Sequence, residues 1–185
     1  MTKVQQLIKN YQGFVYLPWS SNISGSQRIW FAVYPSSEDR HVRAQKKEFE
    51  CATEDAKHRW HLVDITDAPA KFISQHDYRE AYFKEPDAAE SLEDDIKEYV
   101  IEILKKELLS PEVDENTVVA VIGTGSLFGF THISSIISQI DNFIKGRLLV
   151  FFPGIYEKNQ YRFMDARDGF NYMAVPITCD EGMLQ

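Results

Sequence analysis

Three glycines and a histidine form the pattern in this sequence that comes closest to a known chemistry. Gly123, Gly125 and Gly129 follow an apolar run, and His132 opens the apolar-periodic stretch after them. A glycine-rich turn between a strand and a helix can hold a phosphate, because backbone N–H groups at the helix start point at the anion. The pattern therefore admits a nucleotide-binding or nucleotide-hydrolysing α/β enzyme that uses the loop Gly123–Gly129 with His132.

The spacing of these glycines departs from both phosphate-binding motifs. A dinucleotide fingerprint places its third glycine one residue earlier and an acidic residue at the end of the next strand, where this chain has Phe152 and Pro153. A phosphate loop needs Gly-Lys-Ser/Thr, and position 130 is Phe. We therefore interpret Gly123–Gly129 first as a tight structural turn, with phosphate binding as the alternative, and expect no cofactor.

The remaining candidates for catalysis or metal binding do not assemble into a site. His58 and His61 have a spacing that could serve a metal, but the first ends a predicted helix and the second lies in a predicted strand. Ser134, close to His132, falls inside a predicted helix rather than on a nucleophile elbow. We assign no catalytic residue and no metal ligand, and we expect the chain not to be an enzyme.

The glycine turn lies inside a predicted β-α-β unit. Residues 117–123 are an apolar, β-branched run typical of a strand covered on both faces. Residues 131–145 have apolar side chains at helical spacing, with Gly146 as the predicted C-cap, and residues 147–152 form a second strand closed by Pro153-Gly154.

The flanking chain repeats the alternation of strands and helices. Strands are predicted at 28–34, 60–65 and 171–177, the last at a sheet edge because it contains Pro176. A charged helix is predicted from Ser36 or Ser37 to about His58. The fold class is α/β: a three-layer, mostly parallel sheet of about five strands flanked by helices, Rossmann-like or P-loop-like but lacking the phosphate loop.

We predict one α/β domain over residues 1–185. Residues 1–26 form an N-terminal helix (2–11) and a loop that pack on it, and residues 77–115 form an acidic connection (77–86) and a long helix (87–109). The formal net charge is −8, and segment 77–115 alone, with fourteen acidic and five basic residues, accounts for −9. Because no part of the chain offers a strong positive field, we expect no direct nucleic-acid contact, and a DNA-contacting subunit is the weaker alternative.

The compartment is inferred from what the sequence lacks. No apolar run reaches the length of a membrane span, and the N-terminus has no secretory apolar region. Cys51 and Cys179 fit no disulfide framework or metal spacing. We expect a cytoplasmic protein that does not contact a membrane.

A connection rich in tyrosine, arginine and aspartate, residues 156–172, is the best candidate for a binding surface. Its candidate contact residues are Tyr156, Arg162, Arg167 and Tyr172. Aromatic residues and arginine dominate the energetics of protein interfaces, which favours a partner protein. The alternative is a solvated loop with local ion pairs.

Four stretches in the last part of the chain together resemble the BrxB family of BREX (bacteriophage exclusion) defence systems. They are Val118-Val-Ala-Val-Ile-Gly-Thr-Gly125, Phe130-Thr-His-Ile-Ser-Ser-Ile-Ile137, Leu148-Leu-Val-Phe-Phe-Pro-Gly-Ile-Tyr156 and Asp168-Gly-Phe-Asn-Tyr-Met-Ala-Val-Pro176. The resemblance implies a non-enzymatic component of an anti-phage system. Such a component acts as an adaptor for a larger PglZ-type phosphatase-like protein, with the system's AAA+-type ATPase and DNA methyltransferase as further partners. The family has no established catalytic residues, so it assigns none here.

Overall fold

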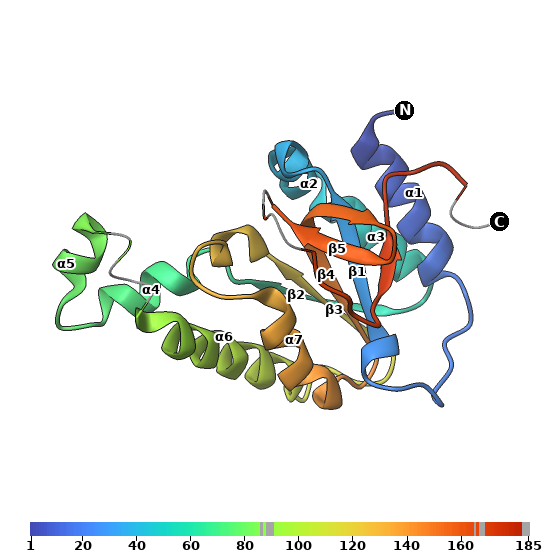
Figure 1. The fold of residues 1–185 in the computed structure, drawn as a ribbon. Coiled ribbons are helices and arrows are strands. Elements are labelled where there is room, and N and C mark those ends of the chain that lie inside the picture. The colour runs from blue at the N-terminus through green and yellow to red at the C-terminus, as the bar shows by residue number, and fades with distance from the viewer. Residues whose placement is uncertain (86, 88–90, 165, 167–168, 183–185) are drawn as a thin grey trace.

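The computed structural model describes residues 1–85, 87, 91–164, 166 and 169–182, which fold into a mostly parallel sheet between two layers of helices (Figure 1). The helices are α1 (Lys3–Val15), α2 (Asp39–Ala44), α3 (Lys46–Asp55), α4 (Ala68–Ser74), α5 (Arg79–Lys84), α6 (Glu93–Leu108) and α7 (Ile133–Ile140). The strands are β1 (Ile29–Tyr34), β2 (Arg59–Asp64), β3 (Thr117–Ile122), β4 (Arg147–Glu157), β5 (Gln160–Phe163) and β6 (Val175–Ile177). Short 3-10 turns include η1 (Ser26–Arg28), η2 (Ser36–Glu38), η4 (Thr124–Leu127) and η5 (Asp141–Phe143).

The sheet has the strand order β2-β3-β4-β1-β6, and every neighbouring pair in this order is parallel. β5 is the exception, because it pairs antiparallel with the far end of β4. The predicted mostly parallel α/β sheet flanked by helices is therefore confirmed, as is the edge position of the strand that contains Pro176.

The two faces of the sheet are both covered, which explains the uninterrupted apolar runs of the central strands. Every residue of β1 and β3 is buried. Alternate residues of these strands pack into different cores: Phe31 packs on the α6 and α7 side, whereas Trp30 packs on the α1 and α3 side. Figure 1 shows these two groups of helices on opposite sides of the sheet. This two-sided burial is the pattern expected of strands in a parallel sheet.

The N-terminal helix α1 is longer than the predicted 2–11 and continues through Gly13 to Val15, which is fully buried. Thr2 begins it with a capping box, in which Thr2 and Gln5 exchange hydrogen bonds. The hydroxyl of Tyr11 lies 2.6 Å from that of Thr53, which ties α1 to α3. The hydrophobic contact of the last turn outweighs the low helix propensity of glycine.

The loop after α1 packs on the amino ends of the strands through a buried arginine. The Arg147 guanidinium lies 4.8 Å from the ring centroid of Trp19 and 5.9 Å from that of Trp30. It donates hydrogen bonds to the carbonyls of Gly146 and Ser20. Two indole faces and two carbonyl dipoles thus accommodate a cation that is 5% exposed.

The single helix predicted from 36 to 58 was wrong, because the chain breaks at Gln45 into α2 and α3. Arg43 of α2 reaches the end of β2, where it donates to Thr66. Phe49 of α3 instead packs against Tyr11 and Phe151 on the face of the sheet. One straight helix would not serve both contacts.

The strand predicted at 147–152 does not end at Pro153-Gly154 but continues to Glu157 and returns as β5. The Pro153 carbonyl accepts a hydrogen bond from the Met164 N–H, so the proline stays within the hairpin. Lys158 and Asn159, both with positive φ, form the two-residue turn between the strands. The first part of the predicted connection 156–172 is therefore one end of a hairpin.

Three other predicted boundaries were also wrong. The helix predicted at 131–145 is α7 (133–140) followed by η5, so Gly146 does not cap a helix. A glycine is required at position 146 because the Thr117 carbonyl oxygen occupies the place where a Cβ would be. The connection 77–86 contains a helix, α5, which projects from the body of the molecule (Figure 1). Of the strand predicted at 171–177, only Val175–Ile177 forms a strand, β6. Phe170, before it, makes an isolated antiparallel bridge to Tyr161 of β5.

Candidate functional site

The loops at the carboxyl ends of the parallel strands meet at one edge of the sheet. The chain leaves β1 toward the α3 side, whereas it leaves β3 toward the α7 side, so the strand order reverses next to β1. In open α/β sheets ligands bind outside such a switch point.

A chain of hydrogen bonds fills the region beyond β1 and β2, and we call it the Arg43 network. The Tyr34 hydroxyl donates to Asp39 Oδ1 (2.8 Å), and Arg43 Nε donates to Asp39 Oδ2 (2.7 Å). Arg43 Nη1 donates to the Thr66 hydroxyl (2.9 Å), which in turn donates to Asp64. One guanidinium thus serves two aspartates, and each named side chain has a partner within the network.

The electrostatics of the Arg43 network disfavour an added anion. Burial acts to raise the pKa of Asp64, but hydrogen bonds from Thr66 and the charge of Arg43 outweigh it and hold that pKa below its usual range. Burial, followed by the charge of Asp39, raises the pKa of Tyr34. Asp64 is therefore charged near neutral pH, in a network that also occupies the end of β1, where a phosphate loop would hold a phosphate.

The first part of the glycine loop is built for close packing. Gly123 adopts a left-handed conformation (φ 90°), and the position of a Cβ on it overlaps Thr66. The Thr124 hydroxyl donates to the Phe151 carbonyl at 2.6 Å. The geometry at Gly123 and Thr124 agrees with the structural turn that the sequence predicts.

The last part of the same loop borders a pocket of about 470 Å³. Gly129 also has a positive φ (84°), but no atom lies within 4 Å of where its Cβ would be. The pocket is lined by Glu93, Phe128, Gly129, Phe130, Thr131, His132, Ile133, Ser134, Phe163, Ala166 and Phe170. The structure therefore separates Gly129 and His132, which line this pocket, from Gly123 and Gly125, which do not.

The start of α7 faces this pocket without a side-chain cap. His132 is the N-cap residue, in extended conformation, and its side chain makes no capping hydrogen bond. Thr131 is 7% exposed, and within the described part of the chain its Oγ1 has no hydrogen-bond partner. Because that oxygen is itself buried, only the uncapped turn of α7 leaves hydrogen-bonding capacity at the pocket that the described side chains do not use.

The candidate interaction residues occupy different environments. Arg162 is exposed on β5 and pairs with Ile155 of β4. Tyr156, the residue after Ile155, is half-buried, and its hydroxyl donates a hydrogen bond to Asn159. Tyr172 is half-buried, and burial together with the charge of Asp141 raises its pKa to about 12. Arg167 lies outside the described residues.

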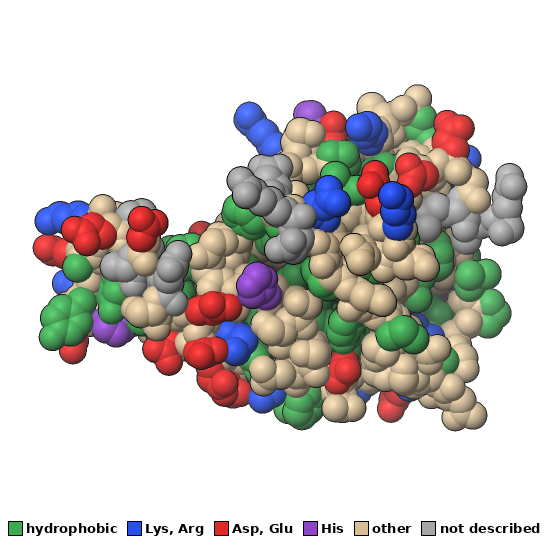
Figure 2. Space-filling model, in the orientation of Figure 1, with side chains coloured by type: hydrophobic (Ala, Val, Ile, Leu, Met, Phe, Trp, Pro, Cys, Tyr) green, Lys and Arg blue, Asp and Glu red, His purple; other side chains and the backbone are tan. Residues whose placement is uncertain are grey.

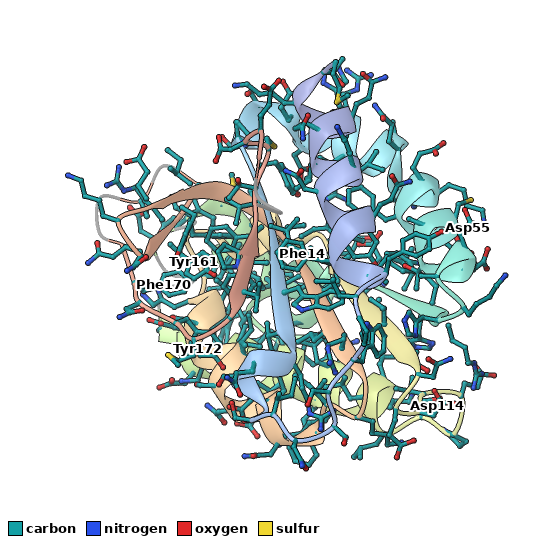
Figure 3. The ribbon with its side chains drawn as sticks, turned by 90° about the vertical axis from the view of Figure 1, so that its right-hand side faces the viewer. Phe14, Asp55, Asp114, Tyr161, Phe170 and Tyr172 are labelled. Carbon is teal, nitrogen blue, oxygen red and sulfur yellow. The ribbon has the colours of Figure 1, made fainter. Side chains whose placement is uncertain are left out.

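An aromatic cluster supports the hairpin from the α7 side of the sheet. The ring centroid of Phe31 lies 4.7 Å from that of Tyr161 and 6.2 Å from that of Tyr172, and Phe170 stacks on Tyr161 at 5.7 Å. Figure 3 shows Tyr161, Phe170 and Tyr172 together beside β1. The Tyr161 hydroxyl donates to the Ala174 carbonyl at 2.7 Å. Tyr172 therefore contributes to packing as well as being a candidate contact.

The two histidines considered as metal ligands have separate partners. His58 Nδ1 pairs with Asn116, and the His58 ring stacks on Trp19 at 3.7 Å. His61 Nε2 lies 2.7 Å from a carboxylate oxygen of Glu107 on α6. Among the residues that the structure describes, no group of three or more His, Cys, Asp or Glu side chains is arranged to hold a metal ion.

A model of the BrxB family, described as BREX protein BrxB, matches residues 62–177, more than half of the chain. The chain belongs to the BrxB family. No curated protein and no solved structure matches it significantly. Family membership makes the protein a component of a BREX anti-phage defence system.

The part of the chain that matches the BrxB family contains most of the features described above. It runs from β2 to β6 and includes the glycine loop, the pocket before α7 and the hairpin. Figure 2 shows acidic side chains gathered over α5 and α6, the segment whose negative charge the sequence indicates. In the described ranges, no helix is long and apolar enough to cross a membrane.

Sequence reasoning missed two sets of residues in this BrxB-family chain. The Arg43 network joins α2 to the end of β2, and only the Asp39–Arg43 spacing of four residues, which suits a helical ion pair, pointed to it. The wall residues Phe163 and Phe170 reach the pocket from the end of β5 and the segment after it. The sequence gives no signal for that contact, because it depends on the hairpin.

Proposed function

We propose that this protein is a non-enzymatic adaptor of its BREX system, which binds a PglZ-type phosphatase-like partner through the β4–β5 hairpin. The observation that carries the proposal is an apolar side chain exposed on that hairpin beside an unpaired strand edge. Ile155 is 43% exposed and pairs in register with Arg162. Exposed apolar and arginine side chains that neighbour each other are typical of interface anchors.

The surface around Ile155 is hollowed on both sides. One hollow of about 270 Å³ lies toward Tyr34, Pro35 and Cys179, and a smaller one of about 100 Å³ lies toward Arg162. Ile155 and Glu157 line both hollows. A partner side chain on either side of Ile155 would therefore find a depression to fill.

The backbone of β4 adds an open edge to this surface. Successive residues of an antiparallel strand direct their N–H and C=O groups to opposite sides. Because the Pro153 carbonyl bonds to Met164 on the β5 side, the backbone groups of Tyr156, three residues later, point away from β5. β1 ends at Tyr34, opposite Pro153, so none of the described strands pairs with β4 at Tyr156. An extended segment of a partner can add to such an edge.

The Arg43 network supports a non-enzymatic role. It places Asp39 and its partner Arg43 beside Tyr34 at the end of β1, where a nucleotide-hydrolysing enzyme would bind phosphate. The nucleotide-hydrolysing alternative is tested by phosphate release from ATP and GTP with the isolated protein. Turnover proportional to protein concentration would contradict the adaptor proposal. The DNA-contacting alternative is tested by a salt-dependent gel shift.

Co-purification tests the adaptor proposal directly. We expect Arg162→Glu to reduce recovery of the tagged PglZ-type partner about tenfold, since an anchoring interface arginine contributes roughly 1.4 kcal/mol or more. Arg162→Glu combined with Arg167→Glu should reduce it further. Lys71→Glu is the matched control, because Lys71 is exposed on α4, away from the hairpin.

The result depends on the variants being folded, which the thermal unfolding of each isolated variant checks. Recovery that is unchanged in Arg162→Glu, or equally reduced in Lys71→Glu, would count against the hairpin surface. The same experiment repeated with the system's AAA+-type ATPase or methyltransferase as bait would identify either as the direct partner instead.

A further inference from the structure

We propose that an extended segment of the partner protein enters the sheet as an additional strand, in line with β1, between β4 and the residues that follow β6. This inference rests on the adaptor function proposed above and names the kind of contact that the partner makes there. It places that contact in the larger of the two hollows beside Ile155, which has a volume of about 270 Å³.

The end of β1 leaves a gap in the sheet. β1 lies between β4 and β6 and pairs with both, but its last pair with β4 joins Tyr34 to Pro153. The chain then turns into η2 at Ser36, whereas β4 continues to Glu157. Neighbouring strands lie about 4.8 Å apart, so the two flanks of β1 are about 10 Å apart, which is the room that one strand needs.

The lining of the hollow shows that both flanks of β1 reach this gap. The lining residues come from the end of β1, the extension of β4, the segment after β6 and the start of α1: Val33–Pro35, Gly154–Glu157, Thr178–Asp180 and Lys3. The hollow therefore lies beyond the end of β1, in line with it, and its two side walls are β4 and the segment after β6.

The β4 wall offers backbone hydrogen bonds to a strand in the gap. The backbone N–H and C=O of Tyr156 point away from β5, because the Pro153 carbonyl three residues earlier bonds to Met164 on the β5 side. None of the described strands pairs with Tyr156 on the side of the gap. A partner strand can bond to both groups, and such main-chain bonds supply the affinity in β-strand addition.

The opposite wall is held in place from α1. Asn10 is 4% exposed, and its Nδ2 donates to the carbonyls of Thr178 and Asp180, each at 2.8 Å. Gln6 in turn donates to Asn10 Oδ1 at 3.0 Å. Because the carbonyls on both sides of Cys179 are bonded to α1, this wall is fixed before a partner arrives.

The chemistry of the hollow favours an aliphatic side chain on the partner segment. Val33, Pro35 and Ile155 line it, and Cys179 Sγ lies 3.6 Å from the Val33 carbonyl oxygen. The charged residues of the lining are of both signs: Lys3, Glu157 and Asp180. In strand addition, a pocket for one side chain supplies the specificity. We therefore expect a valine, leucine or isoleucine of the partner to enter this hollow.

Alkylation of the two cysteines tests the proposal in the complex of the whole protein with the tagged PglZ-type partner. Cys179 lines the hollow, whereas Cys51 is exposed on α3 and is the internal control. Burial raises the pKa of Cys179 to about 11, so its modification by iodoacetamide is slow enough to follow by mass spectrometry.

We expect the partner to protect Cys179 and to leave Cys51 reactive. With about nine-tenths of the protein bound, modification of Cys179 should slow about tenfold, because only the free fraction reacts. An unchanged rate at Cys179 in the recovered complex, or equal protection of both cysteines, would overturn the proposal.

Two substitutions at one position separate backbone pairing from side-chain contact. Tyr156→Pro removes the N–H that faces the gap and keeps the hydrogen bonds between β4 and β5, whereas Tyr156→Val loses the same ring but keeps the N–H. We expect Tyr156→Pro to recover about tenfold less partner than Tyr156→Val, the effect of losing a backbone hydrogen bond at a blocked strand edge. Equal recovery by two folded variants would refute strand addition. If thermal unfolding shows that Tyr156→Pro is not folded, the alkylation result alone decides.

The outcomes distinguish this inference from the adaptor function on which it rests. If the parent protein recovers no PglZ-type partner, the adaptor proposal fails and this inference fails with it. If the partner is recovered but Cys179 stays reactive, the partner binds the hairpin in another way, and only this inference fails.

Discussion

The two ends of the loop between β3 and α7 differ in how completely their groups are used. At the Gly123 end, the backbone packs against Thr66 and the Thr124 hydroxyl is bonded. At the Gly129 end, space lies open and the Thr131 hydroxyl has no partner among the described residues. A single glycine-rich motif therefore contains a structural turn and one wall of a pocket. The glycine spacing alone does not distinguish them.

The largest expected difference between the two ends comes from adding a methyl group to each glycine. Gly123→Ala should lower the free energy of unfolding by about 3 kcal/mol or more, because it combines a left-handed backbone with overlap on Thr66. Gly129→Ala should cost only about 1 kcal/mol, from the backbone conformation alone. Urea unfolding measures both.

Gly125→Ala is the control for the glycine pair. Its Cβ would meet Pro153 at 3.7 Å, an ordinary contact, and its φ is not in the left-handed region. We expect a change within about 0.5 kcal/mol. Equal losses in Gly123→Ala and Gly129→Ala would remove the distinction between the two ends.

A second test removes Arg43, the cation that is hydrogen-bonded to Thr66 beside Gly123. Arg43→Met deletes the hydrogen bonds to Asp39 and Thr66 and leaves the two carboxylates without it. Because the Arg43 side chain is 31% exposed, we expect a loss of about 1–2 kcal/mol, less than for a fully buried ion pair. The exposed Arg40 on the same helix is the control, and Arg40→Met should change stability by no more than about 0.5 kcal/mol. Equal effects would show that the network adds nothing to stability.

Acid titration of the same pair sharpens this result. The pKa of Asp64 in the native protein lies below its usual value, so its charged form stabilises the fold above the unfolded-state pKa of about 3.9. That stabilisation is lost as the pH falls through the lower, native pKa. Without Arg43, the native pKa of Asp64 should move up toward the unfolded value. We therefore expect the free energy of unfolding to fall less steeply below about pH 4 in Arg43→Met than in the parent protein. An unchanged slope would contradict the role given to Arg43.

The smallest expected effects come from replacing Thr124 and Thr131, which lie at opposite ends of the loop between β3 and α7. Thr124→Val leaves the buried Phe151 carbonyl without its 2.6 Å hydrogen bond and should cost about 1–1.5 kcal/mol. Thr131→Val removes a hydroxyl that bonds to no described residue and should be neutral or slightly stabilising. A comparable loss in both, by urea unfolding, would mean that Thr131 has a partner in the folded protein.

The parts of the fold that the sequence predicted are those that local pattern decides. The apolar runs of β1 and β3 indicate strands covered on both faces, and their alternation with helices indicates a parallel sheet. The hairpin was missed because Pro153-Gly154 resembles a strand end, and only the bond from Met164 shows why the strand continues. The break at Gln45 depends on contacts with two different elements, which no local pattern contains.

The candidate sites divide in the same way. Gly129 and His132 were found from their motif, because it is local. The Arg43 network and the walls formed by Phe163 and Phe170 come from segments that meet only in the folded chain. The sequence did not predict the exposure of Ile155, since the pairing that exposes it follows from the hairpin register.

The place of β1 between β4 and β6 also bears on how the chain is made by the ribosome. Its partners are β4 and β6, and Tyr34 pairs with Pro153. At about 5–20 residues per second, on the order of ten seconds of translation separate β1 from its first partner strand. During that interval both edges of the apolar strand β1 lack their partner strands, which exposes the nascent chain to aggregation. The sheet can therefore be completed only after β4 has been made, late in synthesis.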